Sequence, residues 1–192
     1  MGRMGMGFRK NKQLLRSNEQ NSMKTKEAVA AFEQVREIPY KLPLTVQEVK
    51  YNCTGKCQKL KNMLEDLGYD VRYRVCAFSW SDLPLPKNVL SQLDDVNSTH
   101  VYLEVNVDGV WVNVDPSWDS NLGNVLTTCN WDGKHSTKIA VPIKEYYDEA
   151  ESKKIMNGIT YDVIQKSIDE NKEFFQEFNK WLETIRGKNV IV

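Results

Sequence analysis

The sequence has no long apolar run, no excess of either charge and only two histidines. No stretch approaches the roughly 18 apolar residues of a membrane-spanning helix, and the N-terminus lacks the apolar segment of a secretory signal. The 192 residues include 26 Lys and Arg against 26 Asp and Glu, so the zero net charge provides no overall field to attract nucleic acid or anionic lipid. We therefore expect a cytoplasmic protein that binds neither nucleic acid nor membrane.

Cysteine is also sparse, and its spacing excludes common metal sites. In a cytoplasmic protein Cys53, Cys57, Cys76 and Cys129 are expected to be reduced thiols rather than a disulfide framework. Neither Cys76 nor Cys129 has a CxxC partner, and His135 lies in a polar segment without a second ligand at metal spacing. No glycine-rich phosphate loop is present. We predict no metal and no cofactor.

The chain divides into a basic N-terminal segment and one domain. Residues 1–22 show neither helical nor strand periodicity, so we expect a disordered tail or a cloning remnant there. Residues 23–192 are long enough for a single core. A helical pattern begins at Lys24 and ends before Pro39. Near the C-terminus one apolar stripe at helical spacing, closed by Gly187, consists of Phe174, Phe178, Trp181, Leu182 and Ile185.

The most regular helical pattern begins at Cys53. Asn52 is a suitable N-cap, Gly68 stands where a C′ cap is expected, and the apolar face between them consists of Cys53, Cys57, Leu60, Leu64 and Leu67. At the start of a helix the macrodipole and the free N–H groups stabilise a thiolate, which makes Cys53 a candidate nucleophile. Cys57 lies one turn further along and is expected to pack as a small apolar residue.

A β-hairpin is predicted around Asp108-Gly109, a two-residue turn that favours type I′. If Val107 pairs with Val110, one face of the hairpin is aliphatic, and the opposite face carries His100, Tyr102, Glu104, Trp111, Asn113 and Asp115. His100 and Asp115 are then diagonal neighbours, with Cβ atoms about 7 Å apart. A carboxylate that holds an imidazole N–H makes the histidine a general base.

Weaker patterns predict four further features. Alternation predicts a strand over residues 71–77, and residues 137–141 form a second candidate strand. Residues 90–96 are a candidate short helix. The charged residues 148–154 are typical of the solvated face of a helix.

Three segments resemble the core of the transglutaminase-like superfamily, a branch of the papain-like cysteine fold. In that family a cysteine opens a helix, and a glycine 15 residues later closes it before a short strand with arginine. Here Cys53 and Gly68 precede Tyr69-Asp70-Val71-Arg72. The second signature is a histidine-led strand, a hairpin and a strand that ends in aspartate before proline, matched here by His100 and Asp115-Pro116. The resemblance covers roughly residues 25–120.

The resemblance implies an α+β fold with the cysteine helix packed on an antiparallel sheet and flanked by C-terminal helices. It also implies acyl transfer through a thioester. Cys53 would attack the amide of a peptide, a protein or a glutamine side chain, His100 would move the proton, and Asp115 would fix the tautomer of His100. Hydrolysis is favoured over transamidation, because a single small domain shows no obvious site for a second substrate.

Other residues of the expected site rest on weaker arguments. An oxyanion hole would include the Cys53 N–H, and Gln47, six residues upstream, stands where papain-like proteases place a side-chain donor. The substrate cleft is expected to be lined by the aromatic residues Trp80, Tyr102 and Trp118.

Two departures from the family pattern and two other functions stay open. Asn52 stands where a glycine commonly precedes the nucleophile, and Gly55-Lys56-Cys57 offers a competing Gly-x-Cys. The spacing to Gly68 and the helix-start argument favour Cys53. One alternative function is a non-catalytic module that uses the cleft to bind a peptide. The other is acyl transfer from a small thioester donor, as in arylamine acetyltransferases, although no sequence feature indicates a coenzyme A site.

Overall fold

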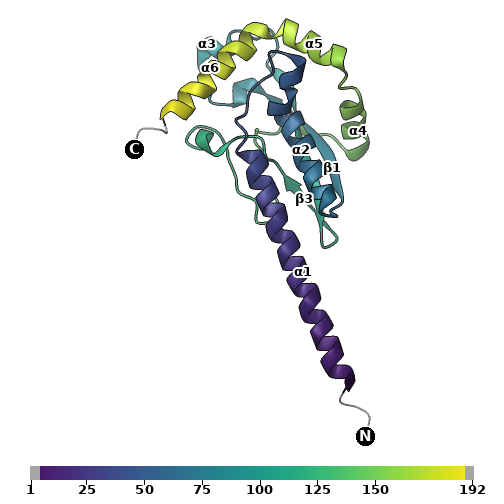
Figure 1. Cartoon of the computed structure of the whole chain (residues 1–192). Coiled ribbons are helices and arrows are strands. Elements are labelled where there is room, and N and C mark those ends of the chain that lie inside the picture. Colours follow the sequence, from purple (N-terminus) through teal and green to yellow (C-terminus); the bar gives the residue numbers. More distant parts are fainter. Residues whose placement is uncertain (1–4, 189–192) are drawn as a thin grey trace.

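Helices gather around one antiparallel sheet in the computed structural model, which describes residues 5–188 and the side chains of residues 19–187 (Figure 1). The helices are α1 (Gly5–Arg36), α2 (Cys53–Asp66), α3 (Lys87–Leu90), α4 (Glu149–Asn157), α5 (Tyr161–Glu170) and α6 (Lys172–Lys188). The strands are β1 (Val71–Ser79), β2 (Asn97–Val107), β3 (Val110–Val114) and β4 (Glu145–Tyr146). Short 3-10 helices are η1 (Val46–Tyr51), η2 (Trp80–Asp82) and η3 (Ser120–Leu122).

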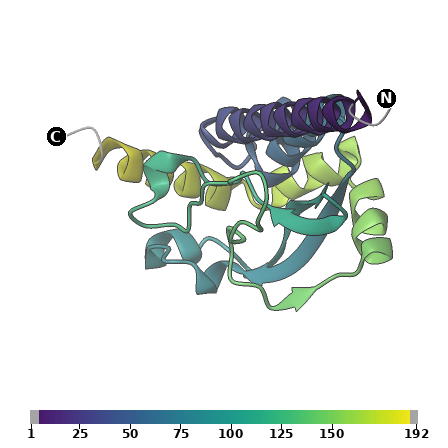
Figure 2. The same ribbon diagram turned by 90° about the horizontal axis from the view of Figure 1, so that it is seen from below.

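The fold is a mixed α+β arrangement built on a four-stranded sheet with strand order β3-β2-β1-β4, in which every neighbouring pair is antiparallel. The helix α2 packs against β2 and β1, and α1 packs in turn on α2. Figure 2 shows α1 along one side of the domain, with the strands on the other side of α2. The predicted packing of the cysteine helix on an antiparallel sheet is therefore confirmed.

The hairpin between β2 and β3 has the predicted turn and register. Asp108 and Gly109 both have positive φ, 51° and 89°, as a type I′ turn requires. Val107 pairs with Val110, and the pairing continues to Leu103 opposite Val114. The aliphatic side chains of this face are buried against α2 away from the turn, whereas Val110 beside the turn is exposed. Because β2 begins at Asn97, His100 belongs to the paired part of the strand and lies opposite Cys76 of β1.

The ends of α2 are fixed by the predicted capping residues. The Asn52 side chain accepts a hydrogen bond from the Gly55 N–H at 3.1 Å, so the helix begins at the candidate nucleophile. At the other end Gly68 has φ 78°, and the Tyr69 N–H bonds the Leu64 carbonyl at 3.0 Å in a Schellman motif. Gly55 also has to be glycine, because a Cβ there would lie 2.3 Å from a backbone oxygen of η1.

Two hydrophobic clusters form the core, and Cys53 packs against both. The first cluster joins α1, α2 and the aliphatic face of the sheet, and includes Phe32, Val35, Leu60, Leu64, Leu103 and Val105. The second is rich in aromatic residues and joins the loops to α6, with Phe78, Trp80, Tyr102, Trp118, Phe174 and Phe178 among its members. The position where the two clusters meet is therefore the start of α2.

The N-terminal segment differs from the sequence-based expectation. The backbone is helical from Gly5, where a disordered tail or cloning remnant was expected over residues 1–22, and residues 1–4 lie outside the described range. The reason is that α1 extends away from the domain (Figure 1), so this part of the helix needs no apolar stripe. A search for hydrophobic periodicity therefore misses it, although residues such as Leu, Gln, Lys and Arg favour helix.

Two smaller predictions were also wrong. Residues 137–141 are not a strand, and Glu145–Tyr146 pairs with β1 instead. The backbone of residues 137–141 is held by other partners, including the Asn113 carbonyl, which accepts from the Thr137 N–H at 2.8 Å. The short helix is Lys87–Leu90 rather than residues 90–96, because Pro86 precedes its first turn.

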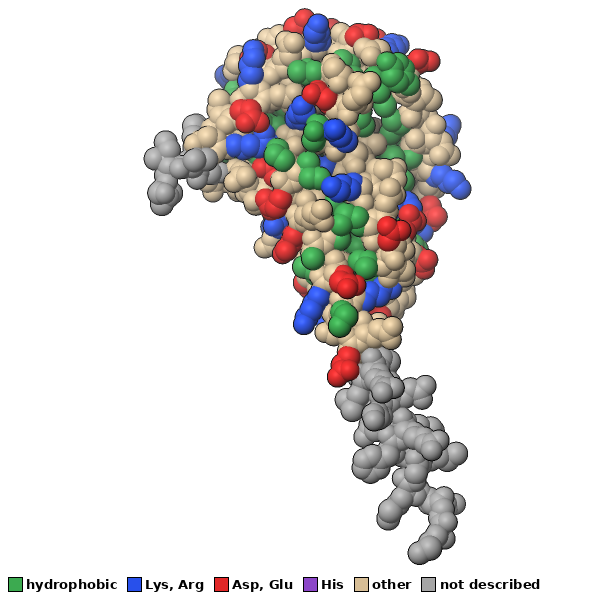
Figure 3. Space-filling model, in the orientation of Figure 1, with side chains coloured by type: hydrophobic (Ala, Val, Ile, Leu, Met, Phe, Trp, Pro, Cys, Tyr) green, Lys and Arg blue, Asp and Glu red, His purple; other side chains and the backbone are tan. Residues whose placement is uncertain are grey.

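The surface is mixed in charge. On the face shown in Figure 3, basic and acidic side chains of the described residues lie interspersed, in keeping with the zero net charge of the chain. Within residues 5–188, no helix combines the length and the apolar character needed to cross a membrane.

Candidate active site

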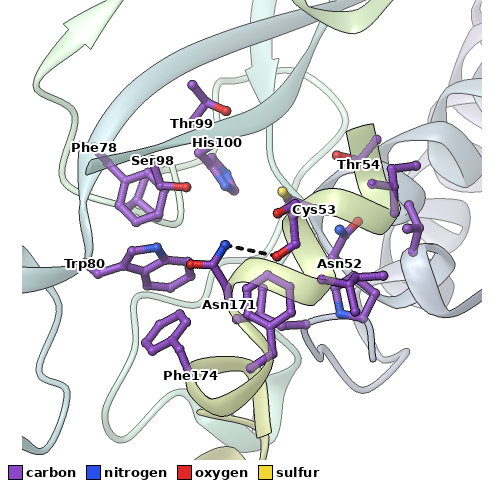
Figure 4. A pocket seen from close by; sticks show the side chains of 18 of the residues that line it. Asn52, Cys53, Thr54, Phe78, Trp80, Ser98, Thr99, His100, Asn171 and Phe174 are labelled. Carbon is purple, nitrogen blue, oxygen red and sulfur yellow. Dashed lines mark hydrogen bonds between the residues drawn. The ribbon is translucent and has the colours of Figure 1, made fainter. Parts of the chain in front are cut away.

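The structure brings together the three residues predicted to form a catalytic triad. Cys53 is the first residue of α2, His100 lies on β2, and Asp115 directly follows β3. The predicted proximity of His100 and Asp115 is confirmed, since His100 Nε2 lies 2.8 Å from Asp115 Oδ2. Figure 4 shows the Cys53 thiol and the His100 ring facing one another. Because Nε2 is taken by Asp115, the ring presents Nδ1 to the sulfur.

The charges of this triad favour a thiolate. Burial opposes ionisation of Cys53, but hydrogen bonding to His100 and attraction to the imidazolium outweigh it, so the pKa of the thiol is lowered. Burial likewise opposes a charged His100, yet attraction and hydrogen bonding to Asp115 raise its pKa to about 10. Both shifts favour the charged pair, a thiolate beside an imidazolium, over the pair of neutral groups.

The Asp115 carboxylate accepts four hydrogen bonds. Its Oδ1 accepts from the Ser117 N–H at 3.0 Å and the Ser117 hydroxyl at 2.6 Å. Its Oδ2 accepts from the Ala140 N–H at 2.7 Å and from His100. Burial favours the neutral acid, but His100, Ser117 and Ala140 together keep the pKa of Asp115 below its ordinary value. The carboxylate is thus fixed in position and held as an anion.

Cys57 behaves as the sequence indicated. It is fully buried, and its Sγ lies 3.4 Å from the Val101 carbonyl. Burial raises the pKa of the Cys57 thiol well above its ordinary value, and the nearby Asp115 and Cys53 add to that shift. A buried thiol with a raised pKa is a poor nucleophile, which supports Cys53 as the reactive residue.

Tyr40 and Cys53 line the same cavity, and their side chains interact electrostatically. Burial and the neighbouring Cys53 charge raise the pKa of Tyr40 well above its ordinary value, so the hydroxyl keeps its proton. The ring is 3% exposed and packs edge-on against Trp118, with centroids 4.4 Å apart. This tyrosine therefore brings a protonated hydroxyl into the cavity that contains Cys53.

A cavity of about 370 Å³ opens beside Cys53 and His100, a volume within the usual range for small-molecule sites. Of the predicted cleft residues, Trp80 and Trp118 line it. Tyr102 is not among the lining residues, because it is 1% exposed within the aromatic cluster.

Gln47, predicted as the side-chain oxyanion donor, also lies away from the cavity. It is exposed on η1 and does not belong to the lining residues. The six-residue spacing before Cys53 does not bring it to the sulfur, because residues 46–51 form a 3-10 helix with Gln47 on the solvent side. Tyr40, by contrast, lines the cavity together with Cys53.

Aromatic rings form the wall of the cavity next to His100. The Phe78 ring lies 6.3 Å from the His100 ring and 4.9 Å from Trp80, and Trp80 lies 5.1 Å from Phe174. Figure 4 shows Phe78, Trp80 and Phe174 along one side of the cavity, with the Asn171 amide between them and Cys53. The C-terminal helices therefore supply part of the wall.

The helix α6 is tied to the segment that carries Tyr40 by two side chains, Asn179 and Arg186, whose polar contacts are here called the α6 clasp. Asn179 pairs with both backbone groups of Leu42, each at 2.8 Å. The Arg186 guanidinium lies 2.6 Å from Asp119 Oδ2 and 2.7 Å from the Tyr40 carbonyl. Asp119 also accepts from the Tyr40 N–H at 3.1 Å. The α6 clasp thus fixes the backbone that positions the Tyr40 ring.

Sequence reasoning missed four groups of this site, namely Tyr40, Ser117, the Ala140 N–H and Lys56. Only Ser117 has a local signal, because a serine two residues after an aspartate suits a turn closed by the carboxylate. The Lys56 side chain is fully buried. It occupies a position between Gly55 and Cys57 that a helical pattern assigns to a polar surface.

The remaining histidine lies at the surface. His135 Nδ1 is 2.6 Å from Asp132 Oδ2, and both side chains are largely exposed. Among the described residues, no group of three or more His, Cys, Asp and Glu side chains is placed to hold a metal ion.

Comparison of the chain with protein-family models, with curated proteins and with solved structures finds no match in any of the three.

Proposed function

We propose that this protein is a cysteine-dependent acyl-transfer enzyme of the papain-like, transglutaminase-like type, which cleaves amides through a thioester on Cys53. One observation carries the proposal. The thiol at the start of α2 faces an imidazole whose second nitrogen is held, at 2.8 Å, by a carboxylate with every acceptor position occupied. In this arrangement a nucleophile, the Cys53 thiolate, and an acid, the His100 imidazolium, lie side by side.

The proposed reaction has two halves. In the first, the Cys53 thiolate adds to the amide carbonyl, the imidazolium of His100 donates its Nδ1 proton to the leaving nitrogen, and the C–N bond breaks to leave a thioester and an amine. In the second, His100 takes a proton from water, the hydroxide adds to the thioester, and the C–S bond breaks. The carboxylic acid is released, and the thiolate and imidazolium are restored.

Tyr40 completes the proposed oxyanion hole. A negative charge develops on the carbonyl oxygen in both halves, and it needs donors that are already in place. The Cys53 N–H belongs to the first turn of α2 and has no acceptor within the helix. The Tyr40 hydroxyl keeps its proton and belongs to the same cavity as Cys53, so it is the second donor of this proposal.

The lining of the cavity favours an uncharged acyl group. Phe78, Trp80 and Phe174 form an apolar wall next to the nucleophile. Among the described lining residues Asp95 is the one carboxylate, and there is no lysine or arginine. The phosphates of coenzyme A would find no lysine or arginine there, which makes arylamine acetyltransferase chemistry the poorer proposal. Hydrolysis stays favoured over transamidation, and the reduced thiol it needs fits a cytoplasmic protein.

The first experiment is alkylation of each cysteine by iodoacetamide across pH, read by peptide mass spectrometry, in the parent and in His100→Ala. We expect Cys53 to react quickly below pH 7 in the parent and to lose that advantage without His100. An ordinary pH profile for Cys53, or faster reaction at Cys57, would contradict the assignment.

Turnover then separates an enzyme from a peptide-binding module. With a panel of peptide and glutamine amides, the parent should release amine or ammonia and Cys53→Ser should not. A module would instead bind peptide equally well in both proteins. Incorporation of an added primary amine would identify transamidation, and release without incorporation would identify hydrolysis.

A further inference from the structure

A lysine side chain lies fully buried beneath the first turn of α2. Lys56 has no exposed surface, and its Nζ donates to three backbone carbonyls. These are Arg36 at 2.9 Å, Ile38 at 2.7 Å and Ser117 at 2.7 Å. An ammonium has three N–H donors, so each one is matched by an acceptor. A neutral amine has two and would leave one buried carbonyl unpaired.

Several ionisable groups surround this ammonium. Burial is the strongest influence and lowers the pKa of Lys56 to about 7, while Asp119 and Asp115 act in the opposite direction, with smaller effects from Cys57 and Glu37. The three carbonyls favour the charged form of Lys56, because only the ammonium provides three donors, whereas burial favours the neutral amine. The nearest carboxylates include the catalytic candidate Asp115, so the lysine lies within electrostatic reach of the triad.

Ser117 connects Lys56 to the triad. Its carbonyl accepts from the ammonium, and its N–H and hydroxyl both donate to Asp115 Oδ1. The other oxygen of Asp115 holds His100. A movement of Ser117 would therefore change the position of the carboxylate, and with it the orientation of the imidazole.

Lys56 also connects three elements of the fold. It follows Cys53 by three residues on α2, whereas Arg36 and Ile38 lie at the C-terminal end of α1. Ser117 lies in the loop after β3. One side chain thus links the helix of the nucleophile to the end of α1 and to the loop that orients Asp115.

We propose that Lys56 is a positioning residue of this active site, because its buried ammonium fixes Ser117, and through Ser117 the Asp115 carboxylate, relative to the first turn of α2. The inference rests on the proposed function. The competing explanation is purely structural, namely that Lys56 only satisfies the carbonyls at the end of α1. The two explanations differ in their consequence for Cys53. Removal of the ammonium raises the midpoint of Cys53 alkylation if Lys56 positions Asp115, and leaves it unchanged if the role is structural.

The test is the pH profile of Cys53 alkylation in Lys56→Met, measured on the full chain by peptide mass spectrometry. Methionine fills much of the volume but provides neither charge nor donors. We expect the midpoint for Cys53 to rise by about one pH unit or more, because a less firmly held Asp115 stabilises the imidazolium less. Turnover should fall through kcat rather than KM. Lys56→Arg keeps the charge and should recover part of both losses.

Leu64→Ala provides the matched control. Leu64 is fully buried on the same helix and packs in the aliphatic cluster, so its truncation weakens α2 without touching the carbonyls. It should lower stability and leave the Cys53 midpoint unchanged. A folded Lys56→Met with the midpoint of the parent would overturn the proposal and leave Lys56 a structural role.

Ser117→Ala decides the question if Lys56→Met does not fold. This variant removes one donor from Asp115 and keeps the carbonyl that Lys56 holds, so the midpoint should rise in the same direction by a smaller amount. An unchanged midpoint there would equally overturn the inference. An ordinary profile for Cys53 in the parent would instead contradict the proposed function itself, so the two failures are distinguishable.

Discussion

His100 Nε2 lies 2.8 Å from Asp115 Oδ2, and both residues are 3% exposed. The contact follows from the register of one hairpin. Leu103 of β2 pairs with Val114 of β3, so the residue that follows, Asp115, lies on the face of the hairpin that carries His100. Burial makes the contact strong in either protonation state of the neighbouring thiol. The proposed chemistry of the site depends on this contact.

Replacement of Asp115 by Asn should disable the site while the fold persists. An amide nitrogen cannot accept the donors that now bond the carboxylate, and the imidazolium loses its counter-charge. Turnover should fall by roughly 100-fold or more, and Cys53 should lose its fast alkylation below pH 7. Asp132→Asn is the matched control, because Asp132 bonds His135 at the surface. An equal effect of both variants would contradict the assignment.

The stability of the fold should depend on pH through His100. Its pKa is raised to about 10 in the folded chain, mainly by Asp115 acting against burial, compared with about 6.5 when unfolded. This contribution is therefore fully present below about pH 6.5 and is lost as the pH rises through about 10. The lowered pKa of Asp115 has the opposite sign, and its contribution is lost on acidification.

Urea unfolding across pH measures the effect of His100. The comparison uses Cys53→Ser, which removes the titration of the thiol, with and without His100→Ala. The difference in unfolding free energy between the two proteins should shrink as the pH rises from 6 toward 10. A difference that stays constant over that range would show that His100 does not titrate as a partner of Asp115.

Tyr40→Phe should separate acylation of Cys53 from alkylation. Removal of one oxyanion donor typically lowers turnover by roughly 100-fold to 1,000-fold. Iodoacetamide reacts without forming an oxyanion, so alkylation should change only a few-fold. Binding of a peptide aldehyde, whose adduct carries that oxygen, should weaken in parallel with turnover. Tyr73→Phe is the control, since its hydroxyl bonds Gln58 away from the cavity. Equal losses in alkylation and turnover would contradict a role in the oxyanion hole.

The α6 clasp should be important for stability. Arg186→Met would leave Asp119, which is 1% exposed, without the guanidinium that bonds it, and such a loss typically costs about 3–5 kcal/mol. Lys180→Met is the matched control on the same helix, because it breaks only an exposed pair with Glu177 and should cost less than about 1 kcal/mol. Chemical denaturation of the two variants measures the two losses in unfolding free energy. Similar denaturation midpoints would contradict a stabilising role of the α6 clasp.

The caps of α2 provide a prediction for the sequence-encoded part of the fold. Gly68 has φ 78°, so Gly68→Ala should destabilise the chain by about 1–2 kcal/mol through backbone strain alone. Gly187 has no atom within 4 Å of an added Cβ and no positive φ, so Gly187→Ala should be close to neutral. Thermal unfolding of both variants measures the difference in their stability. Equal stability of the two variants would show that Gly68 does not close α2.

Local sequence signals were sufficient to predict the helix α2 and the hairpin of β2 and β3. Asn52 and Gly68 fix the ends of α2, and Asp108-Gly109 fixes the register of the hairpin, because caps and two-residue turns act through hydrogen bonds and dihedral angles a few residues apart. The placement of Cys53 at a helix start and of His100 beside Asp115 followed from those rules alone.

Tertiary structure decided the rest, because the partners lie far apart in sequence and no periodicity relates them. It put Tyr40 rather than Gln47 in the cavity with Cys53, brought the Ala140 N–H to Asp115, and turned a polar position of α2 into the buried side chain of Lys56. It also placed α6 against the cavity, since an apolar stripe indicates that a face is buried but not which surface covers it. The sequence by itself determined where the reactive groups stand on their elements, and the packing of distant segments decided what surrounds them.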